Sequence, residues 1–233
     1  MDWLAINHQI LFYILLAAAL LLTRIPLLGK YFRSVNTLIH ESGHAFITLA
    51  LSGEVIAVNL FADTSGTTVT KAKGKTAQSL IAIAGYPFSA LTGLLSLFLL
   101  HKGYHLHILF ILTSIALLIL ILSLRNMYGF FWAGTFIVLN LLIIYFNNQL
   151  IIYGFAAFYS VIIFTDSIIS SFVLLILAYK QPKKAGDATN LQKTTKIPAF
   201  IWALLLLGFT LFVSWISVAN YFPPVKNLLD SIS

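Results

Sequence analysis

One short segment carries residues whose types and spacing suit metal chemistry. The sequence NTLIHESGHAF, which begins at Asn36, contains the pattern His-Glu-x-x-His. On an α-helix, residues four apart lie on one face, so His40 and His44 can share one Zn²⁺ through their imidazole nitrogens. Glu41 lies beside that position, where it can act as the general base for a water that the metal activates. The pattern therefore predicts a hydrolytic site with one Zn²⁺ per chain.

The composition places this motif in a membrane protein. The chain of 233 residues is 60% hydrophobic and 9% charged, whereas soluble domains carry about a quarter charged residues. We expect an integral protein of the cell membrane, in a bacterial cytoplasmic membrane, with the lipid bilayer around it. Ionisable groups are costly inside a membrane and mark functional sites, which strengthens the zinc prediction. The net charge of +7 lies in short loops that orient membrane proteins, so we expect no nucleic acid partner.

Apolar runs long enough to cross the bilayer recur along the chain. A spanning helix needs about 20 apolar residues. Seven runs qualify, at residues 10–28, 35–51, 78–100, 106–124, 130–146, 150–179 and 198–221. We therefore predict an all-α polytopic membrane protein with about seven transmembrane helices. The first run lacks the basic start and the cleavage site of a signal peptide, so we expect a retained helix.

Two polar stretches interrupt the apolar runs. Residues 53–75 are rich in Val, Thr and Gly and alternate in part, which predicts a short β-hairpin after the second helix, with its turn at DTSG (63–66). An open sheet edge cannot face lipid, so the hairpin lies in water or against the helices near a cavity. Residues 180–196 read as a solvated loop. The excess of Lys and Arg predicts that the hairpin and the 180–196 loop are cytoplasmic.

The third ligand of the metal is less evident. A catalytic zinc takes three protein ligands and keeps one open position. The chain has no cysteine, so a carboxylate is the natural third ligand. Asp166 lies inside a predicted helix, at a depth like that of His44, whereas Asp187 would have to fold back from the 180–196 loop. Depth favours Asp166, but the residues alone leave both open. The remaining histidines read as interfacial residues and not ligands: His8, His101, His105 and His107.

A few further residues have structural interpretations. Gly85, Pro87 and Gly93 suit close packing and a kink in the third predicted helix. Asn126 can either bond a loop backbone or line the cavity.

Several short motifs between residues 36 and 205 resemble those of a known family. HESGHAFITLALSGEVIAV surrounds the zinc motif, DTSG forms the predicted turn, and AGY stands at 84–86. Arg-Asn-x-x-Gly follows at 125–129, and Asp-Ala-x-x-Leu at 187–191 precedes Thr195, Pro198 and Trp202. Together these motifs resemble the site-2 protease family of intramembrane metalloproteases, in its compact peptidase M50B-like branch.

The resemblance implies a zinc metalloendopeptidase that hydrolyses peptide bonds of membrane-embedded proteins or peptides, such as membrane-tethered regulators or leftover signal peptides. Glu41 would be the catalytic base. Better-studied members take their third ligand from an Asn-Pro-Asp-Gly-type loop, which this chain lacks. The branch pattern implies Asp187 instead, with Asp166 as the alternative. It also implies that the hairpin edge, at Val58 and Asn59, holds the substrate extended by strand pairing.

The resemblance implies one membrane metallopeptidase domain over residues 1–233. It would comprise an N-terminal helix (10–34), a site-2-protease-like core (35–205), and the end of the last helix with the tail (206–233). Two other functions are alternatives. An inactive relative would bind a membrane partner, but the retained Glu41 argues against this. A metal transporter would spread polar residues along several helices, whereas here the intramembrane ionisable residues are confined to the second helix and Asp166.

Overall fold

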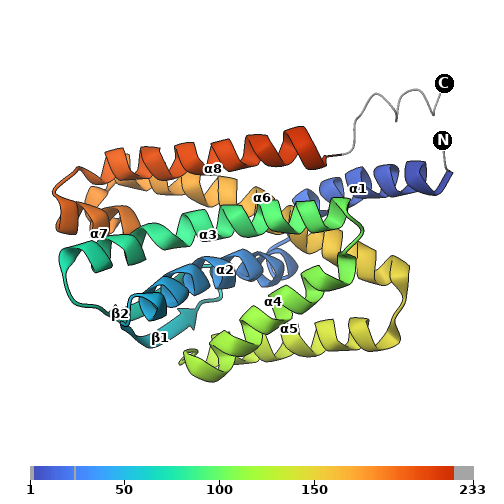
Figure 1. Ribbon diagram of the computed structural model, residues 1–233, viewed down its shortest axis with the longest axis horizontal. Helices are drawn as coiled ribbons and strands as arrows, with labels where there is room; N and C mark the ends of the chain where they lie inside the picture. Colours follow the sequence, from blue (N-terminus) through green and yellow to red (C-terminus); the bar gives the residue numbers. More distant parts are fainter. Residues whose placement is uncertain (1–2, 24, 223–233) are drawn as a thin grey trace.

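The computed structural model describes residues 3–23 and 25–222, most of which form helices (Figure 1). In chain order the elements are α1 (Trp3–Leu22), α2 (Leu28–Ala50), β1 (Glu54–Leu60), β2 (Gly66–Lys71), α3 (Lys75–His101), α4 (His105–Leu122), α5 (Met127–Phe146), α6 (Gln149–Lys180), η1 (Pro182–Lys184), α7 (Gly186–Thr195) and α8 (Ala199–Tyr221). The β-hairpin after the second helix agrees with the sequence prediction. The part of the predicted tail from residue 223 onward lies outside the described residues.

Five of the described helices are long and apolar enough to cross a membrane, namely α3, α4, α5, α6 and α8. The seven predicted spans are therefore not confirmed. In the described part of α1, the apolar stretch covers only Phe12–Leu22. Helix α2 mixes its apolar residues with polar ones, among them Arg33, His40 and Glu41. Counting apolar runs did not take account of these polar side chains, of which Arg33 faces α6, His40 faces α7 and Glu41 faces the hairpin.

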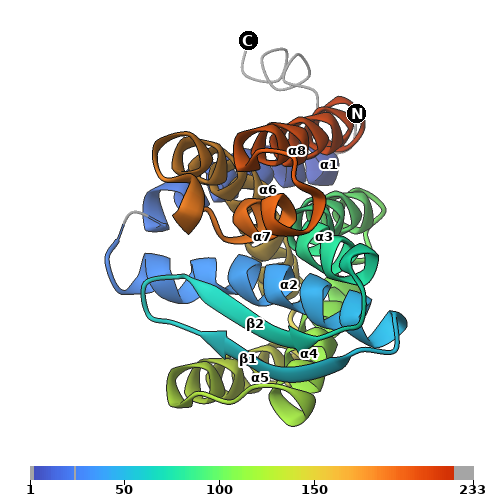
Figure 2. The same ribbon diagram turned by 90° about the vertical axis from the view of Figure 1, so that its left-hand side faces the viewer.

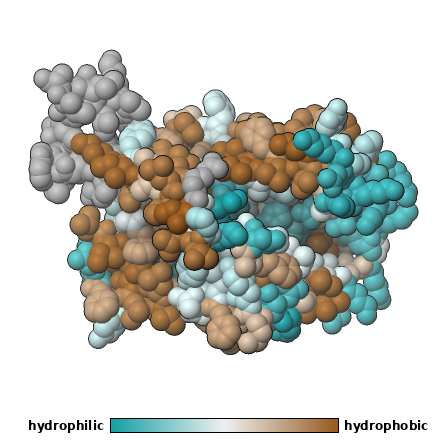
Figure 3. Space-filling view, turned by 180° about the vertical axis from the view of Figure 1, so that it is seen from behind, coloured by the Kyte–Doolittle hydropathy of each residue, from teal (hydrophilic) through white to brown (hydrophobic). Residues whose placement is uncertain are grey.

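Large apolar side chains cover the outer surface of the spanning helices. Phe130 and Phe131 on α5 are more than half exposed, as are Phe212 and Trp215 on α8. Exposed apolar surface on this scale favours lipid over water. Figure 3 shows one such apolar face, with hydrophilic residues gathered at the end of the molecule where α7 and the hairpin lie. The molecule therefore has an apolar body and one polar end.

Two groups of buried side chains hold the helices together. The larger group joins α2, α4, α5, α6 and β1, and includes the fully buried Ile39 and Phe136. The smaller group joins α3, α6, α7 and α8 around alanines such as Ala188. Helices α3 and α6 approach closely at Gly93, where an added Cβ would lie 3.3 Å from the Cα of Phe164. Small residues at such contacts let helices pack closely within a membrane.

The hairpin lies along α2, at the same end of the molecule as α7 (Figure 2). Its strands are antiparallel, with Val58 opposite Thr68 and Asn59 opposite Thr67. At the turn, the Thr37 hydroxyl of α2 donates a hydrogen bond of 2.7 Å to a hairpin carbonyl. The hairpin is thus docked on the helix that carries the His-Glu-x-x-His motif.

The outer edge of β1 is closed by the loop that precedes α5. The Val58 N–H donates to the Ser123 carbonyl at 2.7 Å, and the Arg125 N–H donates to the Val58 carbonyl at 3.1 Å. The Asn126 carboxamide accepts from the Leu60 N–H at 3.1 Å and donates to the Leu60 carbonyl at 2.6 Å. Asn126 therefore bonds a backbone and does not line the cavity. Among the described residues, the sheet has two strands, and β2 keeps the free edge.

Residues 180–196 do not form the solvated loop that the sequence suggested. They form η1 and α7, and α7 packs against α3 and α8 (Figure 2). The buried residues Ala185, Ala188 and Leu191 recur every three positions and face the smaller core. The Trp202 indole N–H also donates to the Thr195 hydroxyl at 2.9 Å, which ties α7 to α8. The loop prediction was wrong because the polar composition conceals this short apolar stripe.

Candidate metal centre

Three ligand atoms from two distant segments meet beside α3. His40 Nε2 lies 3.1 Å from His44 Nε2, and Asp187 Oδ2 lies 3.2 Å from each of these nitrogens. Atoms about 2.0–2.1 Å from one zinc ion, at tetrahedral angles, are roughly 3.3 Å apart. The observed triangle therefore fits a single ion. No other group of three such ligands occurs among the residues that the structure describes.

The chemistry of these donors also suits a cation. His44 Nδ1 lies 2.6 Å from the Ile81 carbonyl oxygen. Because a carbonyl can only accept a hydrogen bond, Nδ1 carries the proton and donates it. The lone pair of His44 is therefore on Nε2, which faces the centre. Burial alone would raise the pKa of the Asp187 carboxyl, but the facing imidazoles, His44 first, lower it below its usual range when they are protonated in the absence of a metal. The carboxylate is thus ionised at neutral pH. A bound dication would satisfy the carboxylate and both lone pairs at once.

Helix α3 approaches the histidines closely at Gly85. A Cβ at this position would lie 2.5 Å from His40 Nε2 and 2.6 Å from His44 Nε2. The next residue, Tyr86, packs its ring edge-on against the His40 ring, with centroids 4.6 Å apart. Sequence reasoning assigned Gly85 to helix packing and missed that it leaves room at the ligand nitrogens. Its place in the AGY motif was the available signal.

Strand β2 contacts the side chain of Glu41, which lies on α2. The Thr68 hydroxyl donates to Glu41 Oε2 at 2.6 Å, and a Cβ at Gly66 would lie 2.6 Å from Glu41 Oε1. Glu41 is 5% exposed, and it borders the same cavity as the ligands. The sequence placed Glu41 through its motif but did not reveal the roles of Thr68 and Gly66. The sequence assigned Gly66 to the turn, so its close approach to Glu41 could not be predicted from the strand pattern.

The centre opens into a cavity of about 590 Å³ between α2, β2, α3 and α7. Hydroxyl and amide side chains make up much of its wall. They include Asn36, Thr37, Thr68, Thr70, Gln78 and Asn190. The cavity can therefore hold water and the polar main chain of an extended peptide.

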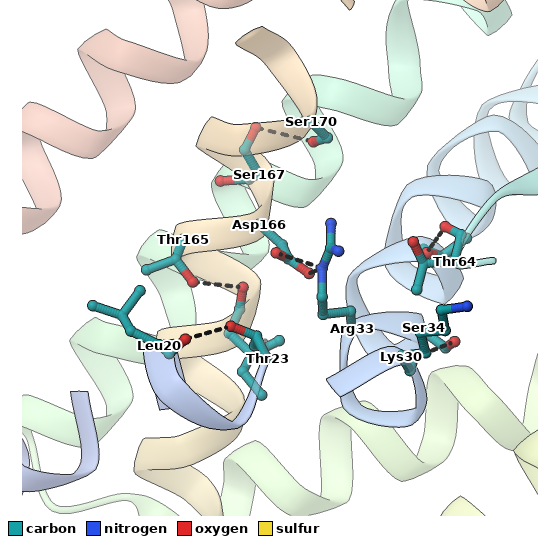
Figure 4. A network of polar contacts seen from close by, with 12 residues as sticks. Leu20, Thr23, Lys30, Arg33, Ser34, Thr64, Thr165, Asp166, Ser167 and Ser170 are labelled. Carbon is teal, nitrogen blue, oxygen red and sulfur yellow. Dashed lines mark hydrogen bonds and ion pairs between the residues drawn. The ribbon is translucent and has the colours of Figure 1, made fainter. Parts of the chain in front are cut away.

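The structure does not bring Asp166, the alternative ligand, to the histidines. Asp166 on α6 accepts from the Nε of Arg33 on α2, at 3.1 and 3.0 Å to its two oxygens (Figure 4). Depth along a helix predicted correctly that Asp166 is buried, because its side chain is only 6% exposed. The position of Asp166 along its helix could not show that Arg33 faces its carboxylate.

The hairpin edge expected at Val58 and Asn59 is not available. Val58 is fully buried, and its N–H and C=O are bonded to the loop before α5. Asn59 stands opposite Thr67, and the alternation of antiparallel pairs turns its backbone toward β2. The prediction was wrong because a hairpin has two edges, and the sequence does not show which one is covered. The free edge belongs to β2, where Thr68 and Thr70 line the cavity.

The other histidines lie away from the centre. His101, His105 and His107 lie around the connection between α3 and α4, where each packs against a tyrosine ring. The side chain of His8 lies outside the described residues. These three described histidines are thus not brought to the candidate metal centre.

A comparison with known protein families gives one match. The family model described as Peptidase M50B-like matches residues 13–217. The matched region contains all three candidate ligands, the hairpin, the helices α3 to α6 and most of α8. No curated protein and no solved structure matches the chain significantly.

Proposed function

The chain belongs to the Peptidase M50B-like family, a branch of the site-2 protease family, and we propose that it is an intramembrane zinc metalloendopeptidase. The observation that carries the proposal is the triangle of His40, His44 and Asp187, with Glu41 beside it. The five apolar helices and the family make it an integral membrane protein, so its substrates would be membrane-embedded proteins or peptides.

His40, His44 and Asp187 would hold one Zn²⁺, and none of the three could be removed without opening a second coordination position. When bound, zinc would supply a Lewis acid and lower the pKa of water. The Ile81 carbonyl fixes the tautomer of His44, and Gly85 keeps the space at both nitrogens free. Asp166 has no part in this centre.

Glu41 would act as the general base and then as the general acid. It takes a proton from the water that attacks the peptide carbonyl, and returns that proton to the leaving amine. The Thr68 hydroxyl donates a hydrogen bond to Glu41 Oε2, so Glu41 Oε1 would accept the proton of the water. This hydrogen bond fixes the direction of the carboxylate before the substrate arrives.

The substrate would lie extended along the free edge of β2. An extended chain can add to an unpaired strand through main-chain hydrogen bonds, and β2 borders the cavity along Gly66–Thr70. A helical substrate would have to unwind first, because a helix uses its own carbonyls. We place this end of the molecule in the cytoplasm, since Lys and Arg are in excess there.

The full-length protein, purified in detergent, tests this proposal. We expect about one zinc per chain and cleavage of peptides derived from transmembrane segments. Glu41→Gln should retain zinc and lower kcat by about 10²–10⁴-fold, the usual contribution of general acid–base catalysis. A zinc-loaded wild type that cleaves none of these peptides would overturn the proposal in favour of a non-catalytic binding protein.

A further inference from the structure

One side chain in the cavity wall, that of Asn36, has an oxygen without a partner among the residues that the structure describes. Asn36 lies on α2 four residues before His40, and therefore on the same face of the helix. It is 6% exposed, and its Oδ1 is buried without a hydrogen bond among the residues that the structure describes. Its side chain nevertheless borders the cavity. An unpaired buried amide oxygen is destabilising. Among the described residues with such an atom, Asn36 is the one that borders the cavity, where a partner from outside can reach its carboxamide.

Another asparagine in the protein shows what such a group can bind. The Asn126 carboxamide accepts from the N–H of Leu60 and donates to its C=O, at 3.1 and 2.6 Å. It thereby pairs with the main chain of β1 as a neighbouring strand would. Asn36 lies on the other side of the hairpin, next to Thr37, whose hydroxyl is bonded to the Thr64 carbonyl before β2 begins.

We propose that the Asn36 carboxamide binds the main chain of the peptide substrate. This inference rests on the proposed peptidase function and adds a binding residue to it. Four residues of helix advance about 6 Å, which is the length of about two residues of extended chain. Asn36 therefore contacts the substrate about two residues from the scissile bond. Because Asn36 bonds the main chain, it fixes which peptide bond of the substrate lies at the metal, without selecting for any substrate side chain.

A matched pair of variants separates this role from a structural one. Asn36→Leu and Asn140→Leu each remove a buried amide that has no partner among the described residues, but Asn140 does not border the cavity. Neither change removes a hydrogen bond between residues that the structure describes. Both variants should therefore keep or exceed the melting temperature of the wild type.

Hydroxamates provide the binding probes. Acetohydroxamic acid binds only the metal, whereas Pro-Leu-Gly hydroxamate and a succinyl-hydroxamate dipeptide extend a peptide to opposite sides of it. Calorimetric titration of the zinc-loaded, full-length protein gives the affinity for each. Asn36→Leu should weaken one of the two peptide hydroxamates about tenfold, as expected for a lost hydrogen bond. Acetohydroxamic acid should bind unchanged, and Asn140→Leu should alter none of the three affinities.

Three results would overturn the proposal. Asn36→Leu could bind all three compounds like the wild type, lose affinity for all three equally, or melt at a clearly lower temperature. Failure of the proposed function looks different, because the wild type would then either bind neither zinc nor acetohydroxamic acid, or bind zinc and cleave no peptide. If the wild type binds acetohydroxamic acid but binds neither peptide hydroxamate more tightly, the proposed role of Asn36 is overturned and the proposed function is not.

Discussion

Two aspartates of this apolar chain, the buried Asp166 and the partly buried Asp187, face different partners. Asp166 on α6 meets the guanidinium of Arg33, so its counter-charge is part of the protein. Asp187 on α7 meets the Nε2 atoms of His40 and His44, each at 3.2 Å. Two imidazoles whose lone pairs converge on a carboxylate are balanced only by protons or by a cation from outside.

The difference shows how to distinguish a structural ion pair from a metal centre in such a protein. The Arg33–Asp166 pair joins α2 to α6 and is complete within the chain (Figure 4). The Asp187 centre joins α2 to α7, borders a cavity and has space for an ion. Burial alone does not separate the two, whereas the sign and number of facing groups do.

Removing each carboxylate should give the largest contrast. Asp187→Asn should reduce bound zinc from about one per chain to nearly none, because two imidazoles and a neutral amide hold the ion poorly. Asp166→Asn should keep its zinc. Elemental analysis after dialysis measures both. If Asp166→Asn lost zinc and Asp187→Asn kept it, the assignment of the two aspartates would be reversed.

Breaking the ion pair should affect stability and not metal content. Arg33→Leu removes the guanidinium that faces the buried carboxylate of Asp166; since Arg33 is about one-third exposed, we expect a loss of about 2–3 kcal/mol. The double variant Arg33→Leu/Asp166→Leu should recover part of that loss, because the buried carboxylate is removed as well. Denaturant titration in micelles measures the change. A double variant less stable than either single one would show that the pair does more than neutralise charge.

Crowding the ligand nitrogens should have a smaller effect that is specific to the metal centre. Gly85→Ala places a Cβ 2.5 Å from His40 Nε2, so the histidines must shift, and zinc affinity should fall about 10–100-fold. Gly93→Ala on the same helix is the control, because its nearest contact is 3.3 Å. Competition with a chelator measures both. Equal affinities in the two variants would mean that α3 adjusts without moving the ligands.

The smallest effect concerns the orientation of the base. Thr68→Val removes the hydroxyl that donates to Glu41 Oε2, and kcat should fall about tenfold. Zinc content and KM should stay as in the wild type, since Thr68 does not touch the ligands. Steady-state kinetics with a cleaved peptide measure this split. An unchanged kcat would show that α2 alone orients Glu41.

Part of the candidate site could be predicted because it is local. His40, Glu41 and His44 lie within five residues, and the helical period brings the two imidazoles together wherever that helix is placed. Asp187 is 147 residues from His40. Asp187 was predicted as the third ligand from a family resemblance, whereas depth along the predicted helix favoured Asp166. The structure brings it to the histidines through α7, whose stripe of small apolar residues was hidden in a polar stretch.

The sequence by itself determined the apolar helices, the hairpin after α2 and the spacing of the histidine motif. These features depend on composition and on short-range periodicity, which a single chain displays directly. The tertiary structure was needed to show that Arg33 faces Asp166, that β2 and not β1 has the free edge, and that Asn36 borders the cavity with an oxygen unpaired among the described residues. Each of these depends on contacts between segments distant in sequence, and local patterns do not specify which segments meet.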